Sequence, residues 1–314
     1  MKVGNRNLAG KKKSRIQKFK KNLPLTILAL PAMLLIFVFK YIPMYGLILP
    51  FKDFDYATGL LKSPWCGFKN FEYLFTNDDV LRATRNTVLY NLVFIVAGMI
   101  VALAVALMLF EMSKRVVKVT QTLLLLPFFI SYIVVSYAVN GMLDMNNGLL
   151  NNLLQALGKE PILWYNEPRY WPVIIVLVAI WKGMGYAGLV YYAALMGTNM
   201  ELYDAAKVDG ASKWKQMWHV SLPSLRPMIS IMLILDFGKI LSTDFGLFYN
   251  VPMNSPLLYE TTDVLSTYTY RALMSIGNIG MSSATSFYTS VVGLFLVLLC
   301  NWIVRKVSEE NALF

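Results

Sequence analysis

Six long apolar stretches divide this chain, and they constrain its fold more than any other feature. They lie near residues 24–49, 86–110, 117–143, 173–198, 227–249 and 286–305. A helix needs ~20 apolar residues to cross the ~30 Å hydrocarbon core of a bilayer, so each stretch is long enough to be a span. A transmembrane β-barrel would instead alternate apolar and polar residues over segments of about 10 residues. The sequence therefore predicts an all-α membrane protein with six transmembrane helices.

Composition and charge agree with a membrane location. Hydrophobic residues make up 57% of the chain and charged residues only 15%, whereas soluble domains carry about 25% charged residues. The net charge of +11 could indicate nucleic-acid binding, but basic residues at the faces of a membrane explain it better. Cys66 and Cys300 fall in a loop and in an apolar stretch, so neither a disulfide nor a metal site is expected from them.

The N-terminal residues predict a basic arm in front of a retained first span. Residues 1–22 contain nine Lys or Arg, and the apolar stretch that follows runs from Leu23 to about Leu49. A signal peptide is the alternative, but no small-residue cleavage site closes the stretch. We therefore expect a cytoplasmic arm over 1–22 and a transmembrane domain over 23–314.

The loops predict the orientation of the spans. With the N-terminus in the cytoplasm, the inner segments contain eighteen of the 29 Lys and Arg residues and the outer segments contain eight. Cytoplasmic loops carry the excess of basic residues in membrane proteins. Both termini and residues 199–226 are therefore expected in the cytoplasm, while 51–85, 144–172 and 250–285 are expected outside. In the outer segment 145–172 we expect a short helix followed by aromatic residues, which suit either the membrane interface or an external partner.

Residues 199–226 have the pattern of a helix, a turn and a second helix. Thr198 and Glu201 have the spacing of a capping box, and Gly210 is placed to end the first helix. Ser212 can cap the second helix, and Pro223 ends it or bends the entry into the next span. A loop that lies on the lipid headgroups is the alternative explanation, because Trp and Lys anchor such loops.

The same segment carries a recognisable signature. Asp204-Ala205-Ala206, then Gly210 after three residues, then Val220, Leu222 and Pro223 after nine more resemble the EAA motif, E-A-A-x3-G-x9-I-x-L-P, of permease subunits of bacterial ABC importers. Asp replaces Glu and Val replaces Ile, which keeps the carboxylate and the β-branched side chain. The stretches "NNGLLNNLLQALGKEPILW" and "LYDAAKVDGASKWKQMWHVSLPSL" are similar to the maltose-type and polysaccharide-type branch of that family.

The resemblance implies a type I ABC importer permease fold and a function. Residues 199–226 would be the coupling segment between helices 4 and 5, with its helix seated in a groove of a separate ATPase. The implied partners are a second homologous permease in a heterodimer, two ATPase subunits, an external substrate-binding protein and membrane lipid, with no nucleic acid. The implied location is the bacterial cell membrane, and the implied cargo is an oligosaccharide.

No pattern in the chain supports catalysis or a metal site. It lacks G-x-x-x-x-G-K-[ST], H-E-x-x-H, C-x-x-C and G-x-S-x-G, so it cannot form the phosphate loop of an ATPase. Its one histidine, His219, lies inside the cytoplasmic segment. We therefore expect no catalytic residue, no metal and no cofactor on this chain, with ATP and Mg²⁺ bound by the partner ATPases.

Charged residues inside the predicted spans suggest a substrate path. Asp236 and Lys239 are three residues apart and could pair on one helical face, and Lys182 could form an ion pair that joins spans four and five. Alternatively, these side chains line a polar path in which aromatic rings stack on sugars. The candidates for that path are Trp181, Lys182, Tyr186, Asp236, Lys239, Asp244 and Tyr249.

Other functions remain open at the level of sequence. An importer of the same family could carry a phosphate ester or a polyamine. An ion-coupled secondary transporter could use Asp236 and Asp244 as its ion site, although the internal repeats common in that class are not evident. A membrane enzyme would need a catalytic motif, and none is present.

Overall fold

The computed structural model describes residues 22–307, so the predicted basic arm lies outside the described residues except for Asn22. Within that range the chain is helical, and its one β-pairing is an isolated bridge between Lys52 and Trp65. Four helical stretches are long and apolar enough to cross a membrane: Asn22–Phe51, Asp78–Glu111, Pro168–Met196 and Ile279–Lys306. Two bent pairs, Lys114–Phe129 with Tyr132–Leu143 and Lys213–Ser224 with Arg226–Phe237, pass the same test together, which allows up to six spans.

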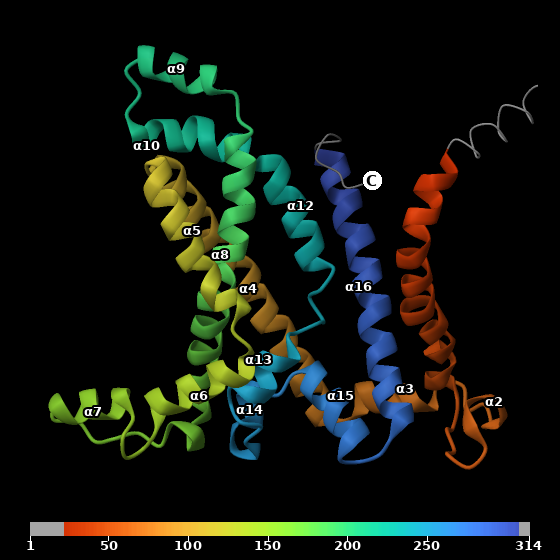
Figure 1. Cartoon of the computed structure of the whole chain (residues 1–314). Helices are drawn as coiled ribbons and strands as arrows, with labels where there is room; N and C mark the ends of the chain where they lie inside the picture. Colours follow the sequence, from red (N-terminus) through yellow and green to blue (C-terminus); the bar gives the residue numbers. More distant parts are fainter. Residues whose placement is uncertain (1–21, 308–314) are drawn as a thin grey trace, which may run out of the picture.

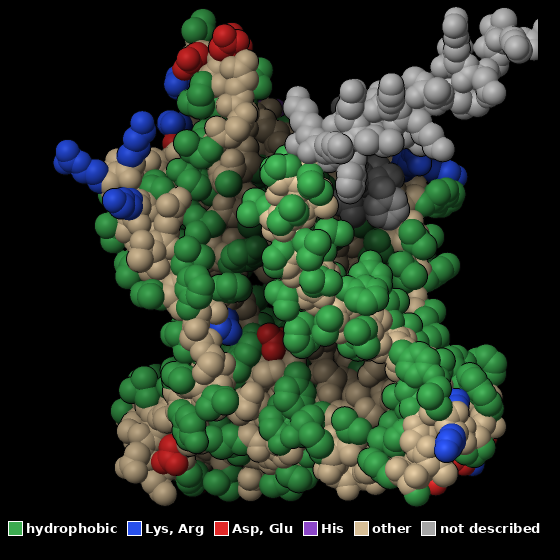
Figure 2. Space-filling view, turned by 45° about the vertical axis from the view of Figure 1, so that its right-hand side comes forward, with side chains coloured by type: hydrophobic (Ala, Val, Ile, Leu, Met, Phe, Trp, Pro, Cys, Tyr) green, Lys and Arg blue, Asp and Glu red, His purple; other side chains and the backbone are tan. Residues whose placement is uncertain are grey.

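The long helices run between two ends of the molecule (Figure 1). One end, which we call the elbow end, carries α9 (Met200–Val208) and α10 (Lys213–Gln216), and the described chain also starts and stops there. The opposite end carries the short helices of the segments predicted to lie outside, namely α2 (Gly59–Lys62), α3 (Lys69–Thr76), α7 (Leu149–Ala156), α14 (Tyr259–Thr262) and α15 (Leu265–Met274). Charged side chains gather at both ends, whereas the band between them is mostly hydrophobic (Figure 2). This distribution is the one that a bilayer requires.

The remaining elements connect these parts. The first span is a helix over 22–36 that continues into η1 (Phe37–Tyr41) and η2 (Ile42–Phe51). The other long helices are α4 (Asp78–Glu111), α8 (Trp171–Met196) and α16 (Ile279–Val307). The bent spans and connections contain α5 (Lys114–Phe129), α6 (Tyr132–Leu143), η3 (Trp164–Asn166), η4 (Pro168–Tyr170), η5 (Met217–Ser221), α11 (Leu222–Ser224), α12 (Arg226–Phe237), α13 (Phe245–Asn250) and η6 (Pro256–Leu258).

Small residues allow α4, α5 and α8 to pack closely. Ala102 and Ala106 of α4 are fully buried against α8 in a cluster with Tyr191 and Leu195. A Cβ added at Gly188 would lie 2.6 Å from Cγ1 of Val105. Small side chains at such contacts let helix backbones approach, which is how helices associate where lipid removes the hydrophobic driving force.

The third apolar stretch, predicted as one span over 117–143, is broken. The axes of α5 and α6 differ by 94°, and the break falls between Phe129 and Tyr132. Pro127 removes a backbone donor in the last turn of α5. Ser131 then caps α6, because its Oγ accepts a hydrogen bond from the Val134 N–H at 3.4 Å. The apolar pattern did not reveal the break because it continues on both sides.

The fifth apolar stretch, predicted as a span over 227–249, ends as a helix at Phe237. Gly238 packs tightly against α16, where a Cβ on the glycine would lie 2.0 Å from Cγ2 of Val297. The chain then runs irregularly to α13. Asn91 of α4 donates hydrogen bonds to the carbonyl oxygens of Ile240 (2.9 Å) and Ser242 (3.2 Å). Irregular backbone at membrane depth needs such partners.

The two π-helices among residues 22–307 both end two residues before a proline. η1 precedes Pro43, and η5 precedes Pro223. A proline ring clashes with the carbonyl group four residues earlier and cannot donate to it. In the wider π turn the backbone accommodates the proline, because the residue before it donates its N–H to the carbonyl oxygen five positions back. Leu222, which precedes Pro223, donates to Met217 in this way.

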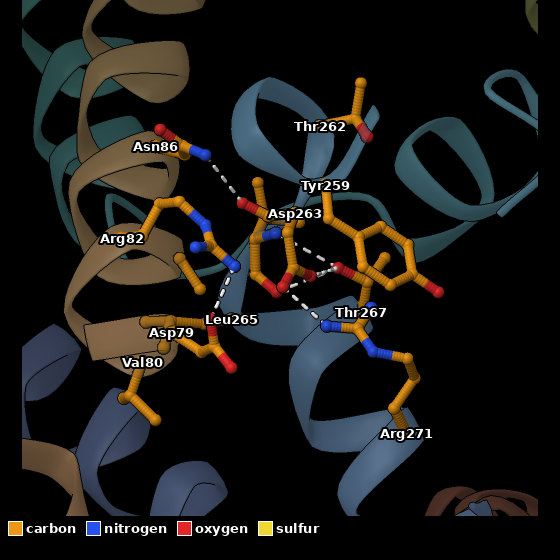
Figure 3. A network of polar contacts seen from close by, with 12 residues as sticks. Asp79, Val80, Arg82, Asn86, Tyr259, Thr262, Asp263, Leu265, Thr267 and Arg271 are labelled. Atoms are coloured by element: carbon orange, nitrogen blue, oxygen red, sulfur yellow. Dashed lines mark hydrogen bonds and ion pairs between the residues drawn. The ribbon is translucent and has the colours of Figure 1, made fainter. Parts of the chain in front are cut away.

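A buried ion pair fixes the opposite end of α4 to α14 and α15 (Figure 3). The guanidinium group of Arg271 pairs with Asp263, whose residue is only 1% exposed. Thr267 donates to the same carboxylate at 2.7 Å, and Asn86 of α4 donates to the Asp263 carbonyl oxygen at 3.0 Å. Because the buried charge is paired and hydrogen-bonded, these contacts hold three elements in one arrangement.

Candidate functional site

We define the elbow as residues 199–226. Its first arm is the helix α9. It begins one residue later than predicted, because Asn199 rather than Thr198 is the N-cap and its side chain accepts the Glu201 N–H at 3.0 Å. The predicted capping box is therefore wrong by one position. Asn is as good a cap as Ser or Thr, so the helix takes the cap nearest to its first turn.

The spacing from Ala206 to Gly210 closes α9 in a defined way. Gly210 has a φ of +73°, as expected for a turn glycine, and no atom lies within 4 Å of a Cβ placed there. Its N–H donates to the Lys207 carbonyl oxygen at 3.0 Å, and the Ala211 N–H donates to that of Ala206 at 2.9 Å. This pair of hydrogen bonds is the Schellman motif. The glycine is thus required by its backbone conformation and not by lack of space.

The second arm runs from Ser212 into the membrane. Ser212 caps α10 as predicted, accepting the Lys215 N–H at 3.4 Å. The helix over Lys213–Ser224 then meets α12 at an angle of 56°. The bend lies at Leu225, two residues after Pro223 and two residues before Pro227, so the two prolines together set the direction in which the elbow leaves the span.

Tyr203 joins the two arms of the elbow and packs it against α4. It is 3% exposed, its hydroxyl is 2.9 Å from that of the buried Ser221, and its ring lies 5.3 Å from that of Phe110 in α4. An ion pair of 2.7 Å between Lys213 and Glu111 adds a second link to α4. Sequence reasoning did not select Tyr203, although its spacing from Ala206 places both on one side of α9.

Replacing Tyr203 should loosen the elbow. Tyr203→Ala removes a buried ring, a change that costs about 3–5 kcal/mol for large-to-small core substitutions. Tyr203→Phe loses only one hydrogen bond, worth about 1 kcal/mol. We expect limited proteolysis to cut the elbow much faster in Tyr203→Ala than in Tyr203→Phe. Leu202→Ala, at a residue 52% exposed, should leave the rate unchanged. Equal cleavage of Tyr203→Ala and the unmodified chain would refute the attachment.

The rest of the elbow presents an exposed surface that is unusually apolar. Asp204, Ala205 and Gly210 are exposed, Ala206 is half-buried, and Val220, Leu222 and Pro223 are half-buried where the elbow joins the spans. Asp204 pairs with Lys207 at 2.8 Å. Val208 is 88% exposed, and exposed apolar groups of this kind mark contact surfaces. The other exposed large apolar residues of the elbow are Met200, Leu202, Trp214 and Trp218.

Lys182 does not pair with an acidic residue of the fifth span. Its ammonium group donates hydrogen bonds to the carbonyl oxygens of Pro127 at 3.0 Å and Phe128 at 2.8 Å, and to that of Ile130. The predicted ion pair between spans four and five is therefore absent from the described residues. The cause is the break between α5 and α6, which leaves backbone carbonyl groups free directly opposite Lys182.

Asp236 and Lys239 also do not form the predicted pair. The part of the chain that the structure describes has no ion pair within 4 Å that involves either residue. α12 ends between them, at Phe237, so the three-residue spacing no longer puts both side chains on one helical face. Asp236 instead lines an otherwise mostly apolar cavity of about 210 Å³ between α4, α8 and α12, together with Gly98, Gly183 and Tyr191.

Aromatic rings gather beside Asp244. The Asp244 side chain caps α13 by accepting the Gly246 N–H at 2.9 Å. Tyr249 stacks on Phe245 with 4.8 Å between ring centroids, and Tyr270 of α15 lies 5.1 Å from Tyr249. Phe245 and Tyr270 were not selected from the sequence. On α8, Trp181 is exposed and Tyr186 stacks on Phe128 at 4.9 Å. Within residues 22–307, neither of these two candidates makes a ring contact with Phe245, Tyr249 or Tyr270.

Fold and site together define a helical membrane protein with a rigid elbow that offers a contact surface at one end. Residues 94–309 match the model of the family described as binding-protein-dependent transport system inner membrane component. The chain is 33% identical to Protein LplB of Bacillus subtilis over 96% of this chain and 95% of that protein. It is 32% identical to the polygalacturonan/rhamnogalacturonan transport system permease protein YteP of the same organism, over 91% of this chain and 89% of that protein.

A solved structure is similar over nearly the whole chain. It is a bacterial alginate ABC transporter in complex with an alginate pentasaccharide-bound periplasmic protein, with a TM-score of 0.83, 31% identity, and coverage of 93% of this chain and 97% of the matched chain. The chain belongs to the family of binding-protein-dependent transport system inner membrane components, the permease subunits of ABC transporters. It is not an enzyme, because ATP hydrolysis in these transporters lies in separate subunits.

Proposed function

We propose that this chain is the permease subunit through which an ATP-driven importer carries oligosaccharides across the bacterial cytoplasmic membrane. The observation that carries the proposal is the elbow. Its first arm is closed by the Ala206–Gly210 motif and leaves apolar side chains exposed, while Tyr203 fixes it to α4. Such an element can transmit the movement of a partner because it cannot bend independently of the spans.

The partners follow from this arrangement and from the family. The elbow end faces the cytoplasm in our proposal, with six spans and both termini on that side. The exposed face around Val208 would be seated in an ATPase subunit. A second, homologous permease would complete a heterodimer with two ATPases below it, and a binding protein would deliver substrate to the opposite end. ATP and Mg²⁺ would be bound by the ATPases alone.

The cargo is inferred from the relatives and from the rings near the opposite end. YteP is named for polygalacturonan and rhamnogalacturonan transport, and the matched structure holds an alginate-loaded periplasmic protein. Within this chain we place the substrate path beside Tyr249, with Phe245 and Tyr270 as added stacking surfaces. Asp236 in its cavity, with Asp244, Lys239, Trp181 and Tyr186, supplies further candidates for polar and aromatic contacts.

Reconstitution tests the proposal directly. The chain is placed in proteoliposomes with the permease, ATPase and binding proteins encoded beside it, and ATP hydrolysis and uptake are measured for alginate, polygalacturonan and neutral malto-oligosaccharides. We expect at least one oligosaccharide to stimulate both activities through its binding protein, whereas phosphate esters and polyamines do not. Uptake driven by an ion gradient without ATP would contradict the proposal and favour a secondary transporter.

A further inference from the structure

The break between α5 and α6 lies inside an apolar stretch, and Lys182 of α8 supplies the hydrogen bonds that the break leaves unmade. Beyond Phe129 the carbonyl groups of Phe128 and Ile130 have no helical partner, whereas that of Pro127 still accepts the Ile130 N–H at 3.3 Å. All three accept from the same ammonium group. An ammonium group has three donors. Each donor of Lys182 is therefore already used by the backbone.

This arrangement suits the membrane. Non-helical backbone at membrane depth is tolerated only where other groups satisfy its polar atoms. A cation is also favoured at the C-terminal end of a helix, where the helix dipole is negative. Tyr132 is the first residue of α6. The ammonium group lies 4.9 Å from the centre of its ring, so Lys182 contacts both sides of the break.

The contacts continue from the break to the aromatic rings. Tyr132 packs against Gly246 of α13, where an added Cβ would lie 2.8 Å from Cδ2 of the tyrosine. α13 carries Phe245 and Tyr249, which stack on each other and contact Tyr270. The position of the break therefore determines the position of Tyr132, and Tyr132 in turn supports α13.

We propose that Lys182 is a positioning residue, whose ammonium group fixes the α5–α6 break so that Tyr132 supports α13 and its rings. The inference rests on the proposed function only in treating those rings as part of the substrate path. It differs from the expectation that Lys182 itself contacts substrate, since its donors are occupied by the backbone.

The test measures the break and transport separately. In the reconstituted importer, Cys66 and Cys300 are replaced by Ser, and spin labels are placed on cysteines at Val119 in α5 and Tyr137 in α6, which are 61% and 69% exposed. In Lys182→Met we expect the label distance to shift or broaden. Maximal stimulated ATP hydrolysis should fall about tenfold, because a small misplacement of a functional site lowers its rate by factors of this order. The half-saturating concentration of loaded binding protein should stay within about twofold. An unchanged label distance with a raised half-saturating concentration would overturn the proposal and make Lys182 a substrate contact.

Two variants control for loss of charge and loss of folding. Lys239→Met removes the positive charge of another predicted span, but Lys239 is exposed and donates no side-chain hydrogen bond among residues 22–307, so the α5–α6 distance should not change. Lys182→Gln keeps two donors without the charge. If Lys182→Met does not assemble, assembly of Lys182→Gln with the original label distance supports the proposal, and its failure overturns it. If no saccharide stimulates the importer, the proposed function fails while the label distance still tests the role of Lys182.

Discussion

Gly185→Ala is expected to prevent α5 and α8 from packing and to reduce the yield of folded chain severely. The added Cβ would lie 1.9 Å from the carbonyl oxygen of Leu124 and 2.5 Å from its carbonyl carbon. Both are backbone atoms, so the contact can be relieved only by moving α5 as a whole. Overpacking of a well-packed site costs about 1–3 kcal/mol and occasionally more, and a backbone contact this close belongs at or above the upper limit. The measurement is the monodisperse fraction of the solubilised importer and its melting temperature.

Gly183 provides a matched control on the same helix. No atom lies within 4 Å of a Cβ placed there, and Ala is a better helix former than Gly. Gly183→Ala should therefore be recovered at least as well as the unmodified chain. Equal recovery of the two variants would show that α5 and α8 do not approach as closely as the structure has them.

The long apolar helices were predictable because lipid imposes a length on every crossing helix. α4, α8 and α16 cover the apolar stretches at 86–110, 173–198 and 286–305. Composition cannot show where a span is broken, since the residues on both sides of a break face the same apolar surroundings. Thus "LPFFISY" contains a proline and a serine cap, but nothing in it states that the chain turns by 94°.

The groups that make each break possible lie far away in the sequence. Lys182 satisfies carbonyl groups more than fifty residues before it, and Asn91 satisfies others about 150 residues after it. Both residues can be recognised in the sequence as polar groups in apolar helices, but the carbonyl groups to which they donate cannot be predicted from it. The expected ion pair of Lys182 failed for this reason: charged side chains in the spans were matched with each other and not with the backbone.

The elbow was more predictable because its signals are local. The Ala206–Gly210 spacing, the Ser212 cap and the position of Pro223 each act within one helical turn of where they occur. Tyr203 was missed because its partners are distant in the sequence: Phe110 lies in α4, and Ser221 lies in the second arm of the elbow. Local chemistry thus predicted the shape of the elbow, and tertiary contacts determined how it is attached.

Gly210→Val is expected to uncouple the elbow while leaving the chain inserted. A φ of +73° is left-handed, which costs about 1–2 kcal/mol for an ordinary L-residue and more for a β-branched one. The backbone can relieve this strain with the smallest rearrangement by breaking the hydrogen bond from the Ala211 N–H to the Ala206 carbonyl oxygen. Loss of this bond would change the direction of the second arm. Because a 1.4 kcal/mol change is about tenfold in an equilibrium, stimulated ATP hydrolysis and uptake should fall by about tenfold or more. Membrane insertion should be normal, since the residue lies outside the spans.

Two variants separate the direction of the elbow from backbone strain in general. Asn tolerates the left-handed region, so Gly210→Asn should retain most of the coupling. Gly158 ends α7 with the same pair of hydrogen bonds, has a φ of +71° and has no atom within 4 Å of an added Cβ. Gly158→Val therefore imposes the same strain at the opposite end of the molecule, and it should leave the coupling between ATP hydrolysis and uptake intact. If it uncouples the importer as strongly as Gly210→Val, strain alone is responsible and the elbow has no special part in transmission.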